Sequence, residues 1–293
     1  EQRRRTRFRA KTLGQVGLAE TIHLMSDQNI SVSVIVPVFN SATTILRALD
    51  SIFSQTTQPQ EIIIVDDAST DDSCAVIEKY IENKLTAKLL RFASNRGPSA
   101  ARNAGWAVAS GDYVAFLDAD DAWHRKKLET QFLFMQDNPE FAITGHQYRV
   151  ITKFESDETN LSGEFDVSIF NFRDFLIKNR FSTPTVMIHK SVDERFDEQQ
   201  RFSEDYLLWL RIIARHNRGA FIKQPMAHLF KPTYGAGGIS GRMFEMYRGE
   251  LANAGALRQQ KLISMSTGLI WRVWLTIKFA VRLTQRPLRK SSK

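Results

Sequence analysis

A cluster of acidic residues, Asp118-Ala119-Asp120-Asp121, directly follows the apolar run 114–117. Two carboxylates separated by one residue after a strand point into the same crevice, and hard oxygen ligands of this kind suit Mg²⁺ or Mn²⁺ bridging to phosphate oxygens. Taken alone, an Asp-x-Asp is more often a solvated acidic turn. The cluster therefore predicts a metal and phosphate site only if other segments bring matching groups to it.

A second acidic pair, Asp66 and Asp67, ends the apolar run 62–65. Carboxylates at this edge of a parallel sheet can accept hydrogen bonds from a nucleotide base or from ribose hydroxyls. The nearby Asp71 and Asp72 are better explained by turn formation and helix capping. We expect Asp66 and Asp67 to bind ligand.

A polar loop, Asn95-Arg96-Gly97, precedes a helix that starts at Pro98 and contains Arg102. Free N–H groups at the start of a helix, together with Arg96 and Arg102, would complement a nucleotide diphosphate. Equally, Arg102 could pair with one of the acidic residues. The residues alone leave both alternatives open.

Alternating short elements are expected to position these groups. Apolar runs and helix-like segments predict strands at 32–38, 62–65, 88–92 and 113–117 and helices at 44–53, 73–83 and 98–109. This order is typical of right-handed βαβ units in an α/β fold with a mostly parallel sheet flanked by helices, where ligands bind beyond the carboxyl ends of the strands. The second half predicts helices at 126–136, 167–178 and 204–216 and strands at 141–154 and 185–189.

The formal charge of +8 is concentrated at the two ends of the chain. Residues 1–24 carry six cations against two acids, and residues 261–293 carry eight cations and no acid, so the intervening body is net acidic. A basic groove for nucleic acid is therefore not expected. The single cysteine, Cys74, excludes an intrachain disulfide and fits a reducing compartment, so we expect a cytoplasmic protein. Residues 1–29 form a basic tail, in which Met25 is the expected natural start.

Five segments in order resemble the motifs of family 2 glycosyltransferases with the GT-A fold. They are Val34–Asn40, Val65–Ser69, Asn95–Asn103, Leu117–Asp121 and Glu204-Asp205, and together they extend over residues 31 to 215. The resemblance implies a single globular GT-A domain of Rossmann-like type, with a nucleotide-sugar-binding half at 30–125, an acceptor-binding half at 126–258 and a helical tail. It also implies an inverting enzyme that uses a nucleoside-diphosphate sugar, often a UDP-sugar, and Mn²⁺ or Mg²⁺.

The same resemblance assigns roles to individual residues. Pro37 and Phe39, with Asn40 beside them, would flank the base, and Asp67 or Asp66 would contact it. Asp118 would contact ribose or metal, next to Ala119, and Asp120 would ligate the metal. Asp205 would be the general base that removes the proton of the acceptor hydroxyl, although an Asp in the first turn of a helix is also favoured by the helix dipole.

The Gly-rich segment 228–241 is expected to act as a lid, with Lys231 reaching the diphosphate. Relatives of this family carry a His after the aromatic-basic pair, whereas Pro232 follows Lys231 here, so a third protein ligand for the metal is not assigned. His228 is a weak substitute.

The tail, residues 259–293, combines apolar and cationic residues but is too charged to span a bilayer. We expect residues 264–286 to form an amphipathic helix on the surface of an anionic membrane, which favours a peripheral protein on the cytoplasmic face and a lipid-linked or cell-surface glycan as acceptor. Packing of the tail against the body or in a homo-oligomer is the alternative.

The acidic residues also resemble parts of other functional sites. A phosphoacceptor receiver would fit Asp66, Asp67 and Asp118, but Lys231 lies too far along the chain for one small domain. A haloacid-dehalogenase-type phosphatase normally has Thr or Val where Ala122 stands. A nucleotide-sugar pyrophosphorylase would need a Gly-rich loop after the first strand, and a sugar-nucleotide-binding protein without transferase activity stays open.

Overall fold

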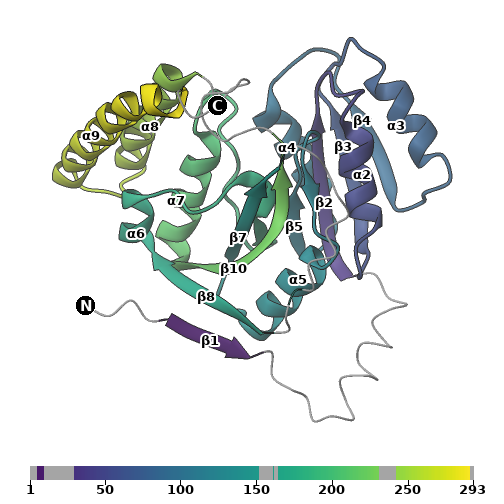
Figure 1. The fold of residues 1–293 in the computed structure, drawn as a ribbon, viewed down its shortest axis with the longest axis horizontal. Helices are drawn as coiled ribbons and strands as arrows, with labels where there is room; N and C mark the ends of the chain where they lie inside the picture. Colours follow the sequence, from purple (N-terminus) through teal and green to yellow (C-terminus); the bar gives the residue numbers. More distant parts are fainter. Residues whose placement is uncertain (1–4, 10–29, 152–160, 162–163, 231–241, 291–293) are drawn as a thin grey trace.

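One mixed β-sheet runs through the part of the chain that the computed structural model describes, residues 5–9, 30–151, 161, 164–230 and 242–290 (Figure 1). Its strands are β1 (Arg5–Arg9), β2 (Ile30–Val38), β3 (Pro59–Asp66), β4 (Ala87–Arg91), β5 (Tyr113–Phe116), β6 (Ala122–Trp123), β7 (Ile143–Val150), β8 (Glu164–Asn171), β9 (Met187–His189) and β10 (Arg218–Leu229). The helices are α2 (Ile45–Phe53), α3 (Ser73–Ile81), α4 (Pro98–Ala107), α5 (Lys127–Asp137), α6 (Phe172–Ile177), α7 (Glu204–His216), α8 (Met243–Gln259) and α9 (Met265–Lys290), with a short 3₁₀ helix, η1 (Thr183–Thr185).

The strand order is β1-β8-β10-β7-β9-β5-β2-β3-β4, and β6 pairs with β10 beside this path. β2 is parallel to β3 and β5, β3 is parallel to β4, and β7 is parallel to β10. β9 lies between β5 and β7 and is antiparallel to both, so β5 and β7 run in the same direction. The carboxyl ends of six strands therefore meet at one edge, which confirms the predicted mostly parallel α/β sheet.

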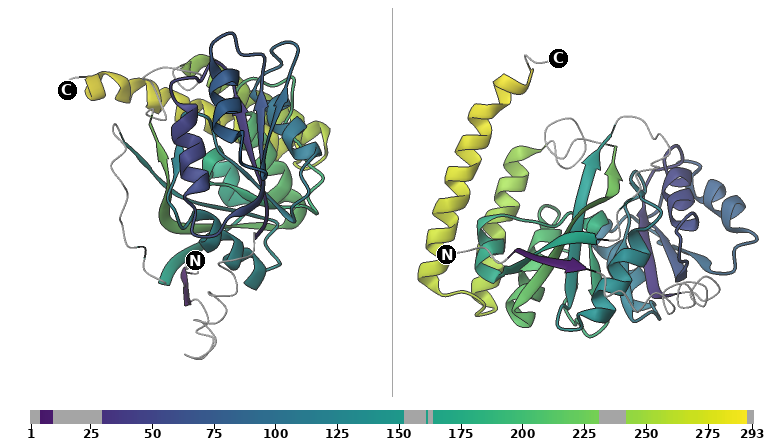
Figure 2. Two further views of the ribbon diagram at one scale, coloured as in Figure 1. Left: turned by 90° about the vertical axis from the view of Figure 1, so that its right-hand side faces the viewer. Right: turned by 60° about the horizontal axis from the view of Figure 1, so that its bottom comes forward.

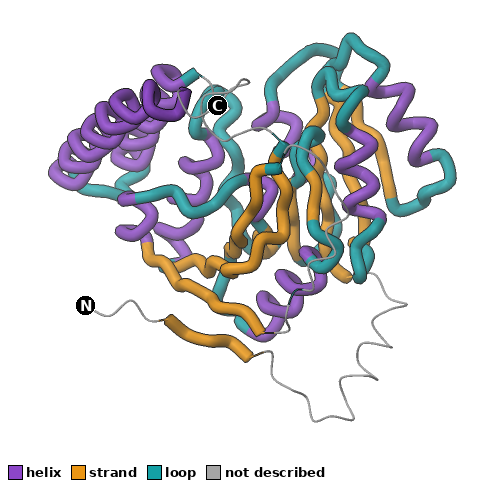
Figure 3. The backbone as a smooth tube through the Cα atoms, in the orientation of Figure 1, coloured by secondary structure: helices purple, strands orange, loops and turns teal. Residues whose placement is uncertain are grey.

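Both faces of the central strands are buried, as continuous β-branched runs require. Successive side chains of a strand point to opposite faces. Val34 and Val36 accordingly join the apolar cluster beneath α2, whereas Ile35 and Ile63 join the cluster that contains residues of α4 and α7. Figure 3 shows the helices gathered on both sides of the strands.

The predicted helix at 167–178 is wrong in its first part. Residues 167–171 end strand β8, which pairs with β10 from Val167 to Asn171. The apolar residues Phe165, Val167 and Ile169 alternate along the chain, a period of two that fits a strand. The helix begins only at Phe172, where the side chains of Asn171 and Asp174 cap it reciprocally.

The tail forms helix α9, which lies along α8 (Figure 2). Trp271, Leu275 and Phe279 are buried against the body. These three residues belong to the segment 264–286 that is expected on a membrane surface, and they are part of the packing between the helices and the body. None of the described helices is long and apolar enough to cross a membrane.

Candidate active site

A cleft of about 1360 Å³ lies at the carboxyl ends of the parallel strands. It extends from the loop after β2 to helices α7, α8 and α9. The predicted site residues that line it are Pro37, Phe39, Asn40, Asp67, Asn95, Arg102, Asp118, Ala119, Asp120 and Asp205. The sheet therefore brings together groups that are up to 168 positions apart in the sequence.

Two predicted residues do not line this cleft. Asp66 is buried and accepts a hydrogen bond from the backbone N–H of Ser69 at 3.2 Å. The guanidinium of Arg96 is bound to Glu198 at 3.1 Å and lies over the ring of Phe92. Lys231, the predicted lid residue, lies outside the described residues.

Asp67 fixes the loop between β4 and α4. Its two carboxylate oxygens accept hydrogen bonds from the backbone N–H groups of Arg96 at 2.6 Å and Gly97 at 2.8 Å. Gly97 has φ +89°, a conformation that residues with a Cβ rarely adopt. The chain then enters α4 at Pro98, whose fixed φ suits the first turn of a helix. Asp67 thus holds the start of α4 in place at the wall of the cleft.

Asn40 connects the loops that follow β2 and β3. Its side-chain oxygen accepts a hydrogen bond from the backbone N–H of Thr70 at 2.8 Å, and its own backbone N–H donates to the hydroxyl of Ser69 at 3.0 Å. The neighbouring ring of Phe39 is 47% exposed at the cleft. Asn40 therefore positions a free aromatic surface on which a base could stack.

Arg102 lies between the two acidic regions of the site. Its guanidinium donates to Asp118 at 2.7 Å and lies 3.6 Å from the carboxylate of Glu204. Burial lowers the pKa of this buried guanidinium, but the nearby charges of Asp118 and Glu204 outweigh burial and raise its pKa above the ordinary value. Of the two alternatives that the sequence left open, the described contacts show the pairing with acidic residues.

Glu204 and Asp205 begin helix α7 at the cleft. Burial, reinforced by the charge of Asp205, raises the pKa of Glu204 to about 7. Burial likewise raises the pKa of Asp205, helped by the charge of Asp118, while hydrogen bonds from Tyr206 and Thr183 and the charge of Arg102 oppose this. A carboxylate with a raised pKa is a stronger base than an exposed aspartate.

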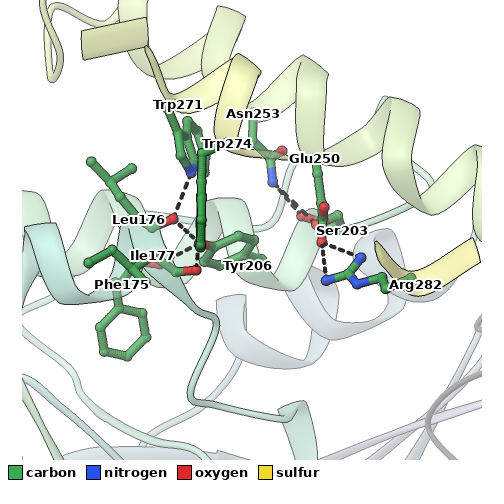
Figure 4. A network of polar contacts seen from close by, with 10 residues as sticks. All are labelled: Phe175, Leu176, Ile177, Ser203, Tyr206, Glu250, Asn253, Trp271, Trp274 and Arg282. Carbon is green, nitrogen blue, oxygen red and sulfur yellow. Dashed lines mark hydrogen bonds and ion pairs between the residues drawn. The ribbon is translucent and has the colours of Figure 1, made fainter. Parts of the chain in front are cut away.

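Helix α8 supports the start of α7 from behind. The fully buried amide of Asn253 donates to the carbonyl and hydroxyl oxygens of Ser203 at 3.1 and 3.3 Å (Figure 4). Gly249 lies so close that an added Cβ would be 2.3 Å from the carbonyl oxygen of Phe202. The sequence interpretation missed both residues, although a glycine inside a helix is a sign of close packing.

The acidic cluster after β5 contains a third carboxylate. Burial, together with the charges of Asp118 and Asp120, raises the pKa of Asp121 to about 8. Arg47 donates to the backbone oxygen of Asp120 at 2.5 Å, and its guanidinium lies 3.5 Å from the centre of the Phe230 ring. The sequence interpretation missed Arg47, because nothing in α2 itself shows that this residue faces the acidic cluster.

The donor set after β5 fits a divalent cation. Asp118 and Asp120 offer carboxylate oxygens at the cleft, beside the third carboxylate of Asp121, and hard oxygen ligands of this kind suit Mg²⁺ or Mn²⁺. Among the described residues, no group of three or more His, Cys, Asp or Glu side chains is arranged to hold a metal. His228 is buried and does not line the cleft. Phosphate oxygens and water would have to complete the shell.

Comparison with known proteins identifies the family. The profile described as "Glycosyl transferase family 2" matches residues 33–196, more than half of the chain. The chain belongs to this family. The matched segment contains the acidic cluster and Arg102, and Asp205 lies just beyond it.

Curated relatives carry the same kind of name. An "Uncharacterized glycosyltransferase" of Rickettsia felis is 34% identical over 212 residues, which cover 71% of this chain and 34% of that protein. The "UDP-Glc:alpha-D-GlcNAc-diphosphoundecaprenol beta-1,3-glucosyltransferase WfaP" of Escherichia coli is 31% identical over 185 residues, covering 63% of this chain and 70% of that protein. The chain thus spans about a third of the length of the Rickettsia relative.

Solved structures share the fold. S. aureus TarS 1–349 in complex with UDP-GlcNAc superposes with a TM-score of 0.62 at 23% identity, covering 77% of this chain and 66% of that one. The mannosyltransferase PcManGT from Pyrobaculum calidifontis, in complex with GDP-Man and Mn²⁺, superposes with a TM-score of 0.59 at 20% identity, covering 80% of this chain and 66% of that one. Together with the sheet topology, these likenesses confirm the GT-A fold.

Proposed function

We propose that this chain is an inverting glycosyltransferase that moves a sugar from a nucleoside-diphosphate sugar, with UDP as the favoured nucleotide, to a hydroxyl group of a lipid-linked glycan. The contact that carries the proposal is made by Arg102, which joins Asp118 at the donor end of the cleft to Glu204 beside Asp205. The side chain of Arg102 therefore connects the proposed phosphate and metal region to the residue beside the candidate base. The names of the Escherichia coli relative and of the TarS complex support the choice of donor and acceptor.

Each end of the cleft has its own task in this proposal. Phe39 offers a stacking surface to the base, and the loop fixed by Asp67 offers the start of α4 to the donor. Asp118 and Asp120 would hold Mn²⁺ or Mg²⁺, which as a Lewis acid stabilises the negative charge that develops on the leaving diphosphate. Asp205 accepts the proton of the acceptor hydroxyl as the oxygen attacks the anomeric carbon from the face opposite the diphosphate.

The raised pKa of Asp205 suits this role. A base is most effective when its pKa approaches the working pH, and Asp205 is shifted upward by burial. The charge of Arg102 opposes this shift. The hydroxyl of Thr183, 3.4 Å from the second oxygen of Asp205, helps to fix its orientation.

The test compares the wild-type chain with the Asp205→Asn variant. With Mn²⁺ and a panel of nucleoside-diphosphate sugars, we expect wild-type turnover of at least one donor, by hydrolysis or transfer, and a loss of roughly 10²- to 10⁴-fold in the variant. UDP affinity, measured by calorimetry, should be the same in both because Asp205 is not a donor ligand. Wild-type binding of UDP without any turnover would favour a sugar-nucleotide-binding protein, and the absence of both would refute the proposal.

We also propose that helix α9 lies on a membrane surface, within residues 264–286. The helix buries one side against the body and leaves an apolar stripe exposed on the other. The stripe is formed by Leu269, Ile270, Val273, Ile277 and Val281. Such a face at the end of a cleft for a lipid-linked acceptor is suited to shallow insertion at the level of the lipid headgroups.

Vesicle sedimentation tests this contact. The triple change of Ile270, Val273 and Ile277 to Ser should abolish sedimentation with anionic phospholipid vesicles, since it removes the apolar area and leaves the charge unchanged. Arg272→Gln on the same helix is the matched control for charge. If the wild-type chain instead forms a dimer that the triple variant loses, and neither sediments with vesicles, the stripe is a homo-oligomer interface.

A further inference from the structure

The two ends of the cleft carry opposite charge. The donor end is lined by Asp67, Asp118, Asp120 and Asp121. The other end, beyond Asp205, lies between the segment after α6 and helix α9. Its charged lining residues in the described part of the chain are Lys178, Arg180, Arg201, Lys278 and Arg282, with Glu250 as the acid among them. This surplus of positive charge lies at the end of the cleft that the donor does not occupy in the proposed function.

Two tryptophans position Lys178 and Lys278. The indole N–H of Trp271 donates to the carbonyl of Leu176 at 2.7 Å, and that of Trp274 donates to the carbonyl of Ile177 at 3.1 Å (Figure 4). Lys178 is the next residue, so it is held beside α9. Lys278 follows Trp274 by four positions and therefore lies on the same face of the helix.

The cations differ in how far they are already neutralised. Arg282 donates two hydrogen bonds to Glu250, at 3.2 and 3.3 Å. In contrast, Lys178, Arg201 and Lys278 form no ion pair within the described part of the chain. Burial lowers the pKa of Lys278; the charge of Glu250 opposes this, and the charges of Arg282 and Lys178 lower the pKa further. An anion between these side chains would relieve their repulsion.

We infer that this end of the cleft binds the diphosphate group of a lipid-linked acceptor. Lys178 and Lys278 are its principal ligands. The inference rests on the proposed function and deepens it. Charge-assisted hydrogen bonds from ammonium groups to phosphate oxygens are among the stronger polar contacts in proteins. Trp274, which is 40% exposed, lines the same part of the cleft. The apolar stripe of α9 faces away from the body, so the lipid chain of a bound acceptor can extend from the subsite toward a membrane.

The geometry separates this subsite from the diphosphate of the donor. The donor diphosphate belongs with Asp118, Asp120 and the start of α4, where a divalent cation supplies the positive charge. Arg102 links Glu204 to Asp118 at the donor end. Ser203, which precedes Glu204, contacts Asn253 of α8, the helix whose Glu250 binds Arg282, so Glu204 and Asp205 lie between the two regions. A diphosphate at Lys178 and Lys278 therefore holds the acceptor on the far side of the candidate base, from which its sugar hydroxyl can extend toward the donor.

The experiment measures binding of farnesyl diphosphate to the full chain by calorimetry, with UDP and Mn²⁺ present at saturation so that the donor end is occupied. Inorganic pyrophosphate and farnesol are the comparison ligands. We expect farnesyl diphosphate to bind, pyrophosphate to bind more weakly and farnesol not to bind. Lys178→Gln and Lys278→Gln should each weaken binding of farnesyl diphosphate about tenfold, as loss of one charge-assisted contact would.

Two matched variants keep the test specific. Arg272→Gln removes a cation of the same helix that does not line the cleft and should bind like the wild type. Lys278→Arg keeps the charge and should retain most of the affinity. Equal binding of farnesol, or wild-type affinity in both Lys→Gln variants, overturns the inference. UDP affinity on the same samples reports the donor end separately, so failure of the subsite and failure of the proposed function are distinguishable.

Discussion

Replacing Arg102 with Gln removes a buried cation from between two carboxylates. The Arg102 side chain is 7% exposed, and its guanidinium lies 2.7 Å from Asp118 and 3.6 Å from Glu204. Removing one partner of a buried ion pair leaves an uncompensated charge and costs about 3–5 kcal/mol in the free energy of unfolding. We expect a loss of this size at about pH 8, where both carboxylates are ionised in the unfolded chain.

The loss should be smaller in mild acid. In the wild type the pKa of Glu204 is already raised from 4.5 to about 7, although Arg102 opposes the rise. Without Arg102 that pKa rises further, so the folded variant keeps a proton that the unfolded chain has released. Since the folded state then binds more protons than the unfolded state, stability falls as the pH rises. Between about pH 6 and pH 8 the wild type loses part of its own Glu204 proton, so the deficit changes by at most about 1.4 kcal/mol.

Urea unfolding, followed by tryptophan fluorescence at both pH values, measures these differences. The double variant Arg102→Gln/Glu204→Gln is the decisive comparison. It removes one of the two carboxylates that lose their counter-ion, so it should recover part of the lost stability at the higher pH. A deficit below about 1 kcal/mol at both pH values, or a double variant no more stable than the single one, would refute the assignment of Arg102 as the shared counter-ion.

Two further changes test the supports of the site. Gly249→Ala should destabilise the chain by roughly 1–3 kcal/mol, because its Cβ would meet the carbonyl oxygen of Phe202 at 2.3 Å. In contrast, a Cβ added at Gly255 in the same helix meets nothing within 4 Å, so Gly255→Ala should stabilise the chain by about 0.5–1 kcal/mol. Thermal unfolding of the two variants measures both effects. Equal shifts of the melting temperature would contradict the close approach of Gly249 to Phe202. Trp271→Phe keeps an aromatic ring but leaves the carbonyl of Leu176 without its indole donor, so we expect a loss of roughly 1–3 kcal/mol in urea unfolding, and an unchanged midpoint would show that this bond contributes nothing.

The first half of the fold could be predicted from the sequence because its strands are short β-branched runs. Such runs, separated by helix-like segments, determine a parallel sheet, and the sheet determines which loops share an edge. The predicted strand at 62–65 falls within β3, and the predicted strand at 113–117 coincides with β5 to within one residue. Asp118, and either Asp66 or Asp67, follow as candidate cleft residues from these two strands.

The side to which each acid points was harder to predict. Asp66 and Asp67 are neighbours at the end of β3, and neighbouring side chains in a strand point to opposite faces. A shift of one residue in the register therefore decides which of them lines the cleft, and the sequence interpretation included both. Asp67 lines it and Asp66 does not.

Long-range packing was the other limit. The sequence predicts a helix from residue 167, where the structure has the second part of β8, because its pairing partner β10 lies more than forty residues further along the chain. Similarly, the role of α8 depends on Asn253 reaching Ser203 across 50 positions. Such contacts are determined by the tertiary structure and leave little trace in local periodicity.

The bonds from Trp271 and Trp274 to the carbonyls after α6 have a consequence for acceptor choice. They attach α9 to the body at two points, and while both bonds hold, the apolar stripe stays at one distance from Asp205. With the stripe on a bilayer, the reacting hydroxyl must stand at one particular height above the lipid. The protein would then select acceptor glycans by the number of sugar units between the lipid anchor and the growing end.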